Sequence, residues 1–222
     1  MTSCVADPTF RHERRNPSSV VNADSDFHIT LVEDGLLPDE RQYLIDEQKR
    51  YKEERSMVSE NGKDVRDKSR TSRTTFLEKS SDSVVECIEH KIAGMAGRPH
   101  SHLESLQITR YKRSQEYRPH FDAFDAPRDN GGQRTTTVFT YLKGIEDERC
   151  GGTTFFPNAT AQDGTEGVHV RPKTGHSVVW ENTDARGKIV EKSLHGGMKV
   201  TCNVEKIGLN AWFGDQPWDK EV

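Results

Sequence analysis

The second half of the chain, from Leu106 onward, is the part of the sequence that most restricts the fold. Short runs of alternating or β-branched residues recur there, and pairs of glycines interrupt them. Such runs are typical of half-buried strands, and Gly-rich segments supply the turns between strands. The predicted strands are 106–111, 136–142, 168–170, 177–180 and 200–204. Many short strands without helices between them predict an antiparallel sandwich or barrel rather than a parallel sheet.

The first half of the chain contributes one predicted strand and two predicted helices. Residues 28–32 alternate and include β-branched side chains, which favours a strand. A helix is expected over 38–54, because it opens with Pro-Asp-Glu, where proline suits the first turn and acids favour the helix dipole. Residues 81–96 carry an apolar stripe that ends at Gly97, so a second helix is expected there. The pattern predicts an α+β fold whose helices buttress one sheet.

Two segments stand apart from these elements. Residues 1–26 are polar and without periodicity, so we expect a tail that is either mobile or lies against the domain, with residues 27–222 forming that domain. Residues 56–75 are mostly polar and basic over a length that is unusual for a plain connection. Their composition alone is typical of a solvated loop, whereas their length is typical of a functional loop or lid.

The charge balance excludes some classes of partner. The chain has 36 acidic and 32 basic residues and a net charge of −4, so it exerts no overall attraction on nucleic acids or anionic membranes. No stretch approaches the roughly 20 apolar residues that a membrane-spanning helix needs. Residues 1–17 lack the apolar core of a secretory signal. We therefore expect a cytoplasmic protein with neither nucleic-acid nor membrane partners.

The cysteines agree with a cytoplasmic location. Cys4, Cys87, Cys150 and Cys202 are far apart and include no C-x-x-C pair, which argues against a redox or zinc motif. Their number permits two disulfides. Because no secretory signal is seen, free thiols in a reducing compartment are the expectation.

Two histidines and an aspartate are the candidate metal ligands. His120 and Asp122 are two residues apart in the run Tyr-Arg-Pro-His-Phe-Asp, so on a strand they share one face, about 7 Å apart. They offer two ligands of a 2-His-1-carboxylate site for Fe(II), although H-x-D triplets also occur by chance. His195, at the entrance of a late Gly-rich strand, offers the third ligand.

A lysine in a predicted β-segment is a candidate anion-binding residue. Lys206 follows His195 by 11 residues and precedes Trp212. An unpaired lysine inside a barrel is costly to bury, so its presence indicates an anionic partner in the cavity. The side chain could equally reach solvent from an edge strand, and spacing alone leaves both interpretations open.

Several short blocks of sequence occur in the order typical of one enzyme family. The blocks are Leu36-Leu37-Pro38-Asp39-Glu40, Arg70-Thr71-Ser72 with Phe76-Leu77, Leu106-Gln107 with Arg110-Tyr111, Tyr117 with Pro119-His120-Phe121-Asp122, Arg134 with Thr137 and Tyr141-Leu142, Gly151-Gly152-Thr153-Thr154-Phe155-Phe156-Pro157, Val170 with Pro172 and Gly175, Ser193-Leu194-His195-Gly196-Gly197, and Lys206 with Trp212. Because these blocks occur in this order, the chain resembles the catalytic domain of the prolyl 4-hydroxylases, which belong to the Fe(II)/2-oxoglutarate dioxygenases. The resemblance extends over about residues 28–213. The resemblance implies a double-stranded β-helix, or jelly-roll, core.

The resemblance also implies a role for each candidate residue. The implied Fe(II) ligands, which are also the implied catalytic residues together with the lysine, are His120, Asp122 and His195. The cosubstrate 2-oxoglutarate would bind through its distal carboxylate, and the residues implied to hold it are Lys206, Tyr111 and Thr154. Trp212 would line the pocket near the metal, O2 would be the second cosubstrate, and ascorbate would be supportive. Residues 56–75 would fold over the substrate.

The sequence departs from the family pattern after the second histidine. Met198-Lys199-Val200 stands where the family commonly has Cys-Pro-Val, and the interval from His195 to Lys206 is one residue longer than usual. A one-residue slip turns a strand's side chains to the opposite face, so we expect a β-bulge to absorb the extra residue. Lys199 is the alternative partner for the 2-oxoglutarate carboxylate.

The sequence as a whole predicts an Fe(II)- and 2-oxoglutarate-dependent dioxygenase. It would hydroxylate an aliphatic C–H, with a prolyl residue of a peptide or protein as the first expectation, and release succinate and CO2. The same chemistry on a free amino acid or small metabolite is open. A catalytically silent module that grips a Pro-rich peptide is the alternative of another class, which the presence of all three candidate ligands disfavours. Nucleic-acid demethylation is disfavoured by the acidic net charge, and the oligomeric state is left open.

Overall fold

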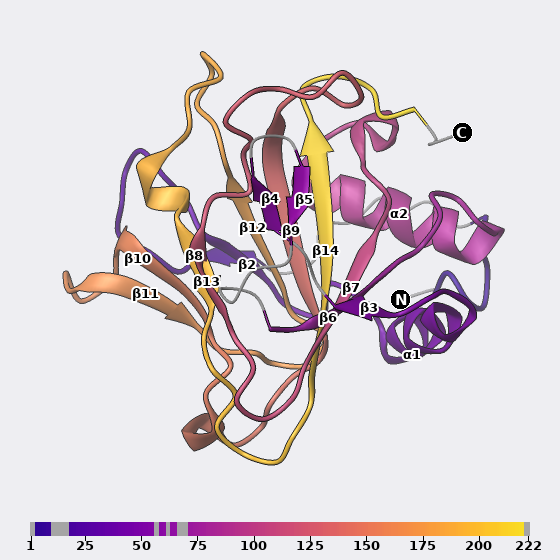
Figure 1. Cartoon of the computed structure of the whole chain (residues 1–222), viewed down its shortest axis with the longest axis horizontal. Helices are drawn as coiled ribbons and strands as arrows, with labels where there is room; N and C mark the ends of the chain where they lie inside the picture. The colour runs from indigo at the N-terminus through magenta and orange to yellow at the C-terminus, as the bar shows by residue number, and fades with distance from the viewer. Residues whose placement is uncertain (1–2, 10–17, 56–57, 61–62, 66–70, 220–222) are drawn as a thin grey trace.

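Two antiparallel β-sheets lie face to face in the computed structural model, which describes residues 3–9, 18–55, 58–60, 63–65 and 71–219 (Figure 1). The larger sheet has the spatial order β1 (Ser18–Val20), β2 (Thr30–Val32), β12 (Ser177–Glu181), β9 (Arg134–Lys143), β14 (Lys206–Gly214), β7 (Gln107–Tyr111), β6 (Arg73–Phe76) and β3 (Glu54–Arg55). The smaller sheet has the order β11 (Glu166–Val170), β10 (Thr154–Thr160), β13 (His195–Gly197) and β8 (Tyr117–His120). The short strands β4 (Val58–Glu60) and β5 (Lys63–Val65) pair with each other.

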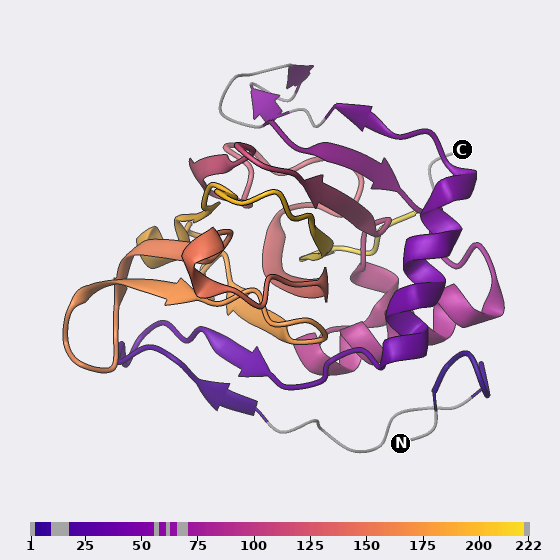
Figure 2. The same cartoon turned by 90° about the horizontal axis from the view of Figure 1, so that it is seen from below.

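Strand β9 shows why the sheets form separate layers. Its side chains alternate, so that Phe139 and Tyr141 face the smaller sheet and pack in one buried cluster with Phe156 of β10. Val138 and Leu142 face the opposite way and pack in a second cluster with the helices. Figures 1 and 2 show both helices on the side of the larger sheet away from the smaller one. The α+β jelly roll buttressed by N-terminal helices is therefore confirmed.

Of the two helices, α1 (Pro38–Glu47) begins and α2 (Ser83–Ala96) ends at the residue that the sequence predicts. Asp82 caps α2 by accepting the backbone N–H groups of Val84 and Val85, and Gly97 ends it in the left-handed conformation. The Glu40 carboxylate accepts the Leu37 N–H at the start of α1 and also pairs with buried Lys91 of α2 at 2.8 Å. In the part of the chain that the structure describes, neither helix has the length and apolar character to cross a membrane.

Several predicted boundaries need correction. The first helix ends at Glu47 and continues only as a short 3-10 turn to Arg50, because its last turns are charged and bury little apolar surface. The predicted strand at 200–204 is wrong: this segment is irregular apart from one bridge at Val200, and the strand begins at Lys206. The β-branched residues there suggested a strand, but their backbone groups pair with loops instead.

The prediction of free thiols is wrong. Cys4 is bonded to Cys87 of α2, and Cys150 is bonded to Cys202, so all four cysteines form disulfides. The error came from inferring the thiol state from the apparent lack of a signal sequence, since spacing along the chain does not show which cysteines are near in space. The cytoplasmic location loses this support and stays a prediction.

The described parts of the predicted tail lie against the domain. Cys4 is almost completely buried, and its N–H donates to Glu40 of α1. β1 pairs with β2 at the edge of the larger sheet, which Figure 2 shows below the other strands. Two alternatives were predicted for residues 1–26, and the described residues among them follow the one in which the tail lies against the domain. The boundary at residue 27 stays a prediction.

Candidate metal and cosubstrate site

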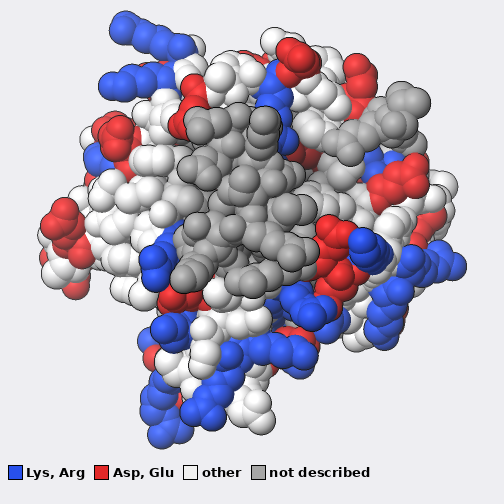
Figure 3. All heavy atoms as spheres, viewed as in Figure 1, with Lys and Arg blue, Asp and Glu red and all other residues white. Residues whose placement is uncertain are grey.

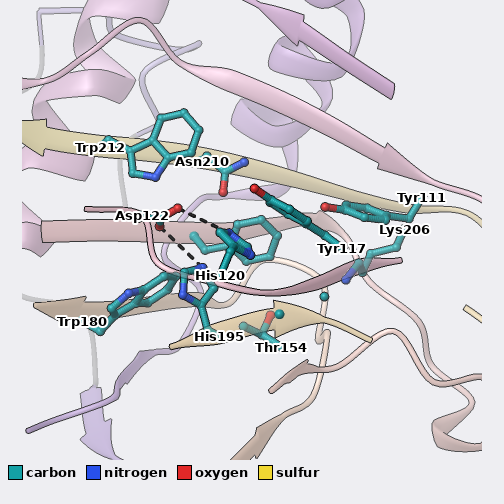
Figure 4. A pocket seen from close by; sticks show the side chains of 13 residues that line it. Tyr111, Tyr117, His120, Asp122, Thr154, Trp180, His195, Lys206, Asn210 and Trp212 are labelled. Carbon is teal, nitrogen blue, oxygen red and sulfur yellow. Dashed lines mark ion pairs between the residues drawn. The ribbon is translucent and has the colours of Figure 1, made fainter. Parts of the chain in front are cut away.

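The three candidate metal ligands converge in the space between the sheets (Figure 4). His120 ends β8 and His195 begins β13, and these paired strands place the two histidines directly opposite each other. Asp122 lies two residues beyond the end of β8, in a bend rather than on the predicted strand face. Ligand atoms of the three side chains all lie within 4.8 Å of one another. Among the described residues this is the one group of His, Cys, Asp and Glu with such geometry.

The hydrogen bonds of both histidines leave the same ring nitrogen free. Nδ1 of His120 lies 2.9 Å from the Arg118 carbonyl, and Nδ1 of His195 lies 2.9 Å from the Ser193 carbonyl. A carbonyl oxygen only accepts, so Nδ1 carries the proton and Nε2 of the neutral ring has a lone pair available. The two Nε2 atoms stand 3.6 and 3.5 Å from the oxygens of Asp122, which is longer than a hydrogen bond. Such spacing fits a shared cation between the three groups.

The protonation states suit a divalent metal. Burial alone would raise the pKa of Asp122, but its charged surroundings, which include the Arg134 guanidinium, hold that pKa well below its usual range, so the carboxylate is charged. Burial lowers the pKa of His195 to about 4, against the attraction of Asp122, so its ring is neutral at physiological pH. Two imidazoles and one carboxylate are the donor set that non-haem Fe(II) sites use.

Lys206 occupies the other end of the same cavity. Its side chain is fully buried, its Nζ donates to the Gly152 carbonyl at 2.7 Å, and it lies 4.7 Å from the centre of the Tyr111 ring. No carboxylate of a described residue lies within 4 Å of this ammonium, and burial lowers its pKa to about 7. A buried cation whose charge has no counterpart fits an anionic ligand in the cavity.

The geometry distinguishes Lys206 from the alternative, Lys199. The side chain of Lys199 is half exposed and its Nζ lies 3.7 Å from Glu116, whereas Lys206 lines the cavity. Between His195 and Lys206, the pairing of β13 with β8 shifts in register between His195 and Gly197, and residues 198–205 then form a loop before β14. That a β-bulge absorbs the extra residue stays a prediction.

The other predicted pocket residues also line the cavity. Thr154 lies there with its hydroxyl 2.7 Å from the Tyr141 hydroxyl. Trp212 forms a wall, and the Arg134 guanidinium lies 3.7 Å from the centre of its ring. Figure 4 shows Tyr117 between the metal end and the lysine end, and Tyr111 beside Lys206.

Sequence reasoning missed several residues of the site. Trp180 packs edge-on against His195, with 4.6 Å between ring centres, and lines the cavity with Phe139 and Asn210. Alternation could have placed Phe139 on the same strand face as Tyr141. Alternation could likewise have placed Asn210 on the face of β14 that carries Lys206 and Trp212. Nothing in the sequence placed Trp180, because His195 lies on a strand of the other sheet.

The segment predicted to cover the substrate falls partly outside the described residues. Within 56–75, the described residues form β4, β5 and the start of β6. The rest of that prediction lies at positions that the structure does not describe. On the face seen in Figure 3, acidic and basic side chains lie side by side, and basic ones predominate along the lower edge.

Comparison with known proteins agrees with this geometry. Residues 106–214 match the model of the 2OG-Fe(II) oxygenase superfamily. The chain is 33% identical over 180 residues to Probable prolyl 4-hydroxylase 3 of Arabidopsis thaliana, covering 74% of this chain and 62% of that relative. It is 33% identical over 200 residues to Prolyl 4-hydroxylase 1 of the same plant, covering 83% of this chain and 68% of the relative.

A solved structure gives the same answer for the fold. The viral collagen prolyl hydroxylase from Paramecium bursaria Chlorella virus-1, in its 2-oxoglutarate complex, is similar with a TM-score of 0.62 and 27% identity. The match covers 83% of this chain and 94% of the viral one. The chain therefore belongs to the 2OG-Fe(II) oxygenase superfamily and, within it, to the prolyl 4-hydroxylase family. Family membership implies Fe(II) and 2-oxoglutarate as cofactor and cosubstrate.

Proposed function

We propose that this protein is an Fe(II)- and 2-oxoglutarate-dependent dioxygenase that hydroxylates a prolyl residue in a peptide or protein, with residues 27–222 as its catalytic domain. The observation that carries the proposal is one cavity with His120, Asp122 and His195 at one end and the buried Lys206 ammonium at the other. A metal site alone would fit many activities. The unmatched cation beside it adds the requirement for an anion that reaches both ends.

At the metal end, His120, Asp122 and His195 would hold Fe(II). Both imidazoles are held in the required tautomer by backbone carbonyls, so no proton has to move before the metal binds. Asp122 supplies the negative charge that offsets part of the metal's charge. When bound, Fe(II) with 2-oxoglutarate and O2 supplies the oxidising power for hydroxylation, with release of succinate and CO2.

At the cosubstrate end, Lys206 would pair with the distal carboxylate of 2-oxoglutarate. The buried hydroxyls of Tyr111 and Thr154 lie on the same cavity and would complete the hydrogen bonding of that carboxylate. Thr154 is suited to this because its hydroxyl already meets the Tyr141 hydroxyl, which fixes its position. Pairing with this carboxylate would give the buried ammonium a counter-charge that no described residue supplies.

The aromatic side chains would keep water from the reacting groups. Trp180 and Trp212 wall the metal end, and Tyr117 stacks on His120 with 3.6 Å between ring centres. A cavity lined in this way favours electrostatic contacts with bound ligands and suppresses side reactions with solvent. Ascorbate would serve as a supportive reductant.

Peptidyl proline as the substrate is supported by the relatives. The plant proteins are named prolyl 4-hydroxylases, and the viral structure is named a collagen prolyl hydroxylase. This chain spans 62% of the length of the first of these plant proteins, so the proposal concerns the portion that it shares with them.

The test is mass spectrometry of a panel of proline-containing peptides, free amino acids and small metabolites after incubation with Fe(II), ascorbate and 2-oxoglutarate. We expect a gain of one oxygen on a peptidyl proline, with succinate formed in step with it. Oxygen gain only on a free amino acid or metabolite would keep the chemistry and overturn the substrate. Metal binding without turnover of any compound would favour a silent peptide-binding module.

A further inference from the structure

The carboxylate of Asp122 is hydrogen-bonded by a residue that does not line the cavity. The hydroxyl of Thr137, on β9, donates to Oδ2 of Asp122 at 2.8 Å. The side-chain amide of Asn182, just beyond β12, donates through Nδ2 to the Thr137 hydroxyl oxygen at 2.8 Å. Thr137 and Asn182 are both completely buried. The three side chains therefore form a chain of hydrogen bonds that leads from the larger sheet to the metal end of the cavity.

The direction of these bonds is set by chemistry. An amide NH2 group can only donate, so the Thr137 oxygen must accept from Asn182. The single hydroxyl hydrogen of Thr137 is then left for Asp122, and a charged carboxylate can only accept. Asn182 thus prevents the hydroxyl from turning away from the carboxylate.

Asn182 and Thr137 are themselves held by backbone structure. The N–H of Asn182 donates to the Thr135 carbonyl at 2.7 Å, and its carbonyl accepts from Val190 at 2.9 Å. Thr137 is paired with Trp180 in the ladder between β9 and β12. The backbone from which each side chain extends is therefore fixed in the larger sheet or directly beside it.

The arrangement joins the two sheets at the metal site. Both histidines stand on strands of the smaller sheet, β8 and β13, whereas Asp122 lies in a bend after β8 and is not held by a strand ladder. Its carboxylate is instead fixed from the larger sheet through Thr137. Groups that orient metal ligands in this way typically matter for metal affinity.

We propose that Thr137 and Asn182 are positioning residues for the carboxylate ligand of the metal, an inference that rests on the proposed function. Thr137 fixes the orientation of Asp122 directly, and Asn182 fixes the hydroxyl of Thr137. Neither residue touches the reacting atoms. Their effect is to hold the carboxylate ready for the cation before the cation arrives.

The chain offers a matched control on the same strand. Thr140 is also completely buried on β9, and its hydroxyl lies 2.6 Å from the Ser177 hydroxyl of β12. It belongs to the opposite face, away from the cavity. Thr140→Val therefore removes a buried hydroxyl from the same strand without touching Asp122.

The experiment is a titration of the full chain with Mn(II) alone. The concentration of free Mn(II) is measured by electron paramagnetic resonance at each step. Relative to wild type, Thr137→Val should weaken Mn(II) binding by about 10- to 100-fold, and Asn182→Leu by a smaller factor of about tenfold. Thr137→Ser should keep an affinity close to wild type, and Thr140→Val should leave it unchanged. Thermal unfolding without metal should give similar midpoints for Thr137→Val and Thr140→Val.

Equal Mn(II) affinity in Thr137→Val and Thr140→Val would overturn the inference, and if wild type still turns over 2-oxoglutarate the proposed function would stand. If Thr137→Val does not fold, unchanged affinity in Asn182→Leu or a strong loss in Thr137→Ser would overturn it. Wild-type protein that binds no Mn(II) and shows no turnover would overturn the proposed function and this inference together.

Discussion

The two ends of the cavity differ in how completely the protein itself satisfies and orients the groups that would bind ligands. At the metal end, Asp122 accepts a hydrogen bond from Thr137 and both histidines are oriented by backbone carbonyls, so the three ligands are held in place before any metal binds. At the cosubstrate end, Lys206 has a carbonyl and an aromatic ring for partners but no carboxylate among the described residues. The metal end is thus preorganised, whereas the lysine end is incomplete. The comparison predicts that changes at the metal end abolish activity and that changes at the lysine end act on 2-oxoglutarate affinity.

The largest effect is expected from Asp122→Ala. The site loses its charged ligand and would be left with two neutral imidazoles, so 2-oxoglutarate turnover should fall below detection. Asp125→Ala, an exposed aspartate in the following bend, is the matched control and should keep full activity. Turnover is measured as succinate formed in the presence of Fe(II) and substrate. Activity near wild type in Asp122→Ala would show that the three ligands have been assigned incorrectly.

Lys206→Ala should have the next largest effect, and on a different quantity. Loss of a buried ion pair worth about 3–5 kcal/mol corresponds to a drop in 2-oxoglutarate affinity of roughly a hundredfold or more. Mn(II) affinity should stay close to wild type, because the lysine lies at the far end. Calorimetric titration of metal-free protein with Mn(II) measures the metal affinity, and titration of the Mn(II)-loaded protein with 2-oxoglutarate measures the cosubstrate affinity.

Lys199→Ala is the control for the lysine variant, since its side chain is half exposed and near Glu116. It should bind 2-oxoglutarate as wild type does. If the loss appeared in Lys199→Ala and not in Lys206→Ala, the cosubstrate end would have to be placed at the loop lysine.

The pH dependence of 2-oxoglutarate binding should report on the same ammonium. With its pKa lowered to about 7, Lys206 is increasingly neutral in the ligand-free protein above that pH and must take up a proton to pair with a carboxylate. Affinity should therefore fall with rising pH by up to about tenfold per unit above pH 7. Lys206→Arg stays charged over this range and should remove the dependence. A flat profile in wild type would contradict the prediction.

The lowered pKa of Lys206 also makes the free energy of unfolding depend on pH. Between pH 7 and the ordinary pKa of 10.5, the unfolded chain holds the proton on Lys206 and the folded chain does not. The contribution of this residue to the free energy of unfolding should therefore rise with pH across that window. Comparing thermal unfolding of wild type and Lys206→Met at pH 7 and pH 9 measures it.

The smallest expected effect is a change in 2-oxoglutarate affinity that only one of the two disulfides should produce when it is removed. Cys150 packs with Tyr111 and Val200, and its bond to Cys202 joins the segment before Gly152 to the loop before Lys206. Replacing both cysteines by serine should weaken 2-oxoglutarate binding roughly fivefold, equivalent to about 1 kcal/mol. The matched pair Cys4→Ser and Cys87→Ser lies at α2 and should leave that affinity unchanged.

Both double variants should lose a similar amount of stability. The pairs are separated by 52 and 83 residues, for which loop closure in the unfolded chain gives up to about 4 kcal/mol each. Chemical denaturation measures this loss. Equal effects of the two double variants on 2-oxoglutarate binding would show that the Cys150–Cys202 bond has no special relation to the cosubstrate end.

Local patterns explain which parts of the fold were predictable. The β-prone run over 136–142 predicted a strand where β9 lies, and the apolar stripe over 81–96 predicted α2, because each pattern belongs to a single element. Residues 200–204 have strand-like composition but pair with other loops, so local propensity misled. The disulfide pairing was unpredictable, since residues 83 apart give no signal of their closeness.

The residues of the candidate site also fall into those that the sequence predicted and those that it did not. His120 and Asp122 were found because they are near each other in sequence, and His195 and Lys206 because their blocks occur in a recognisable order. Asn182 could not be found, because its contact with Thr137 spans 45 positions and exists only through the pairing of β9 with β12. Sequence therefore revealed the groups that meet the ligands and missed those that orient them.

The central claim is tested most directly by anomalous diffraction from crystals grown with Mn(II) and 2-oxoglutarate. The account predicts a metal peak within coordinating distance of His120 Nε2, His195 Nε2 and an Asp122 oxygen, with the distal carboxylate of 2-oxoglutarate against Lys206. A metal peak held by other side chains, or 2-oxoglutarate bound away from Lys206, would contradict it.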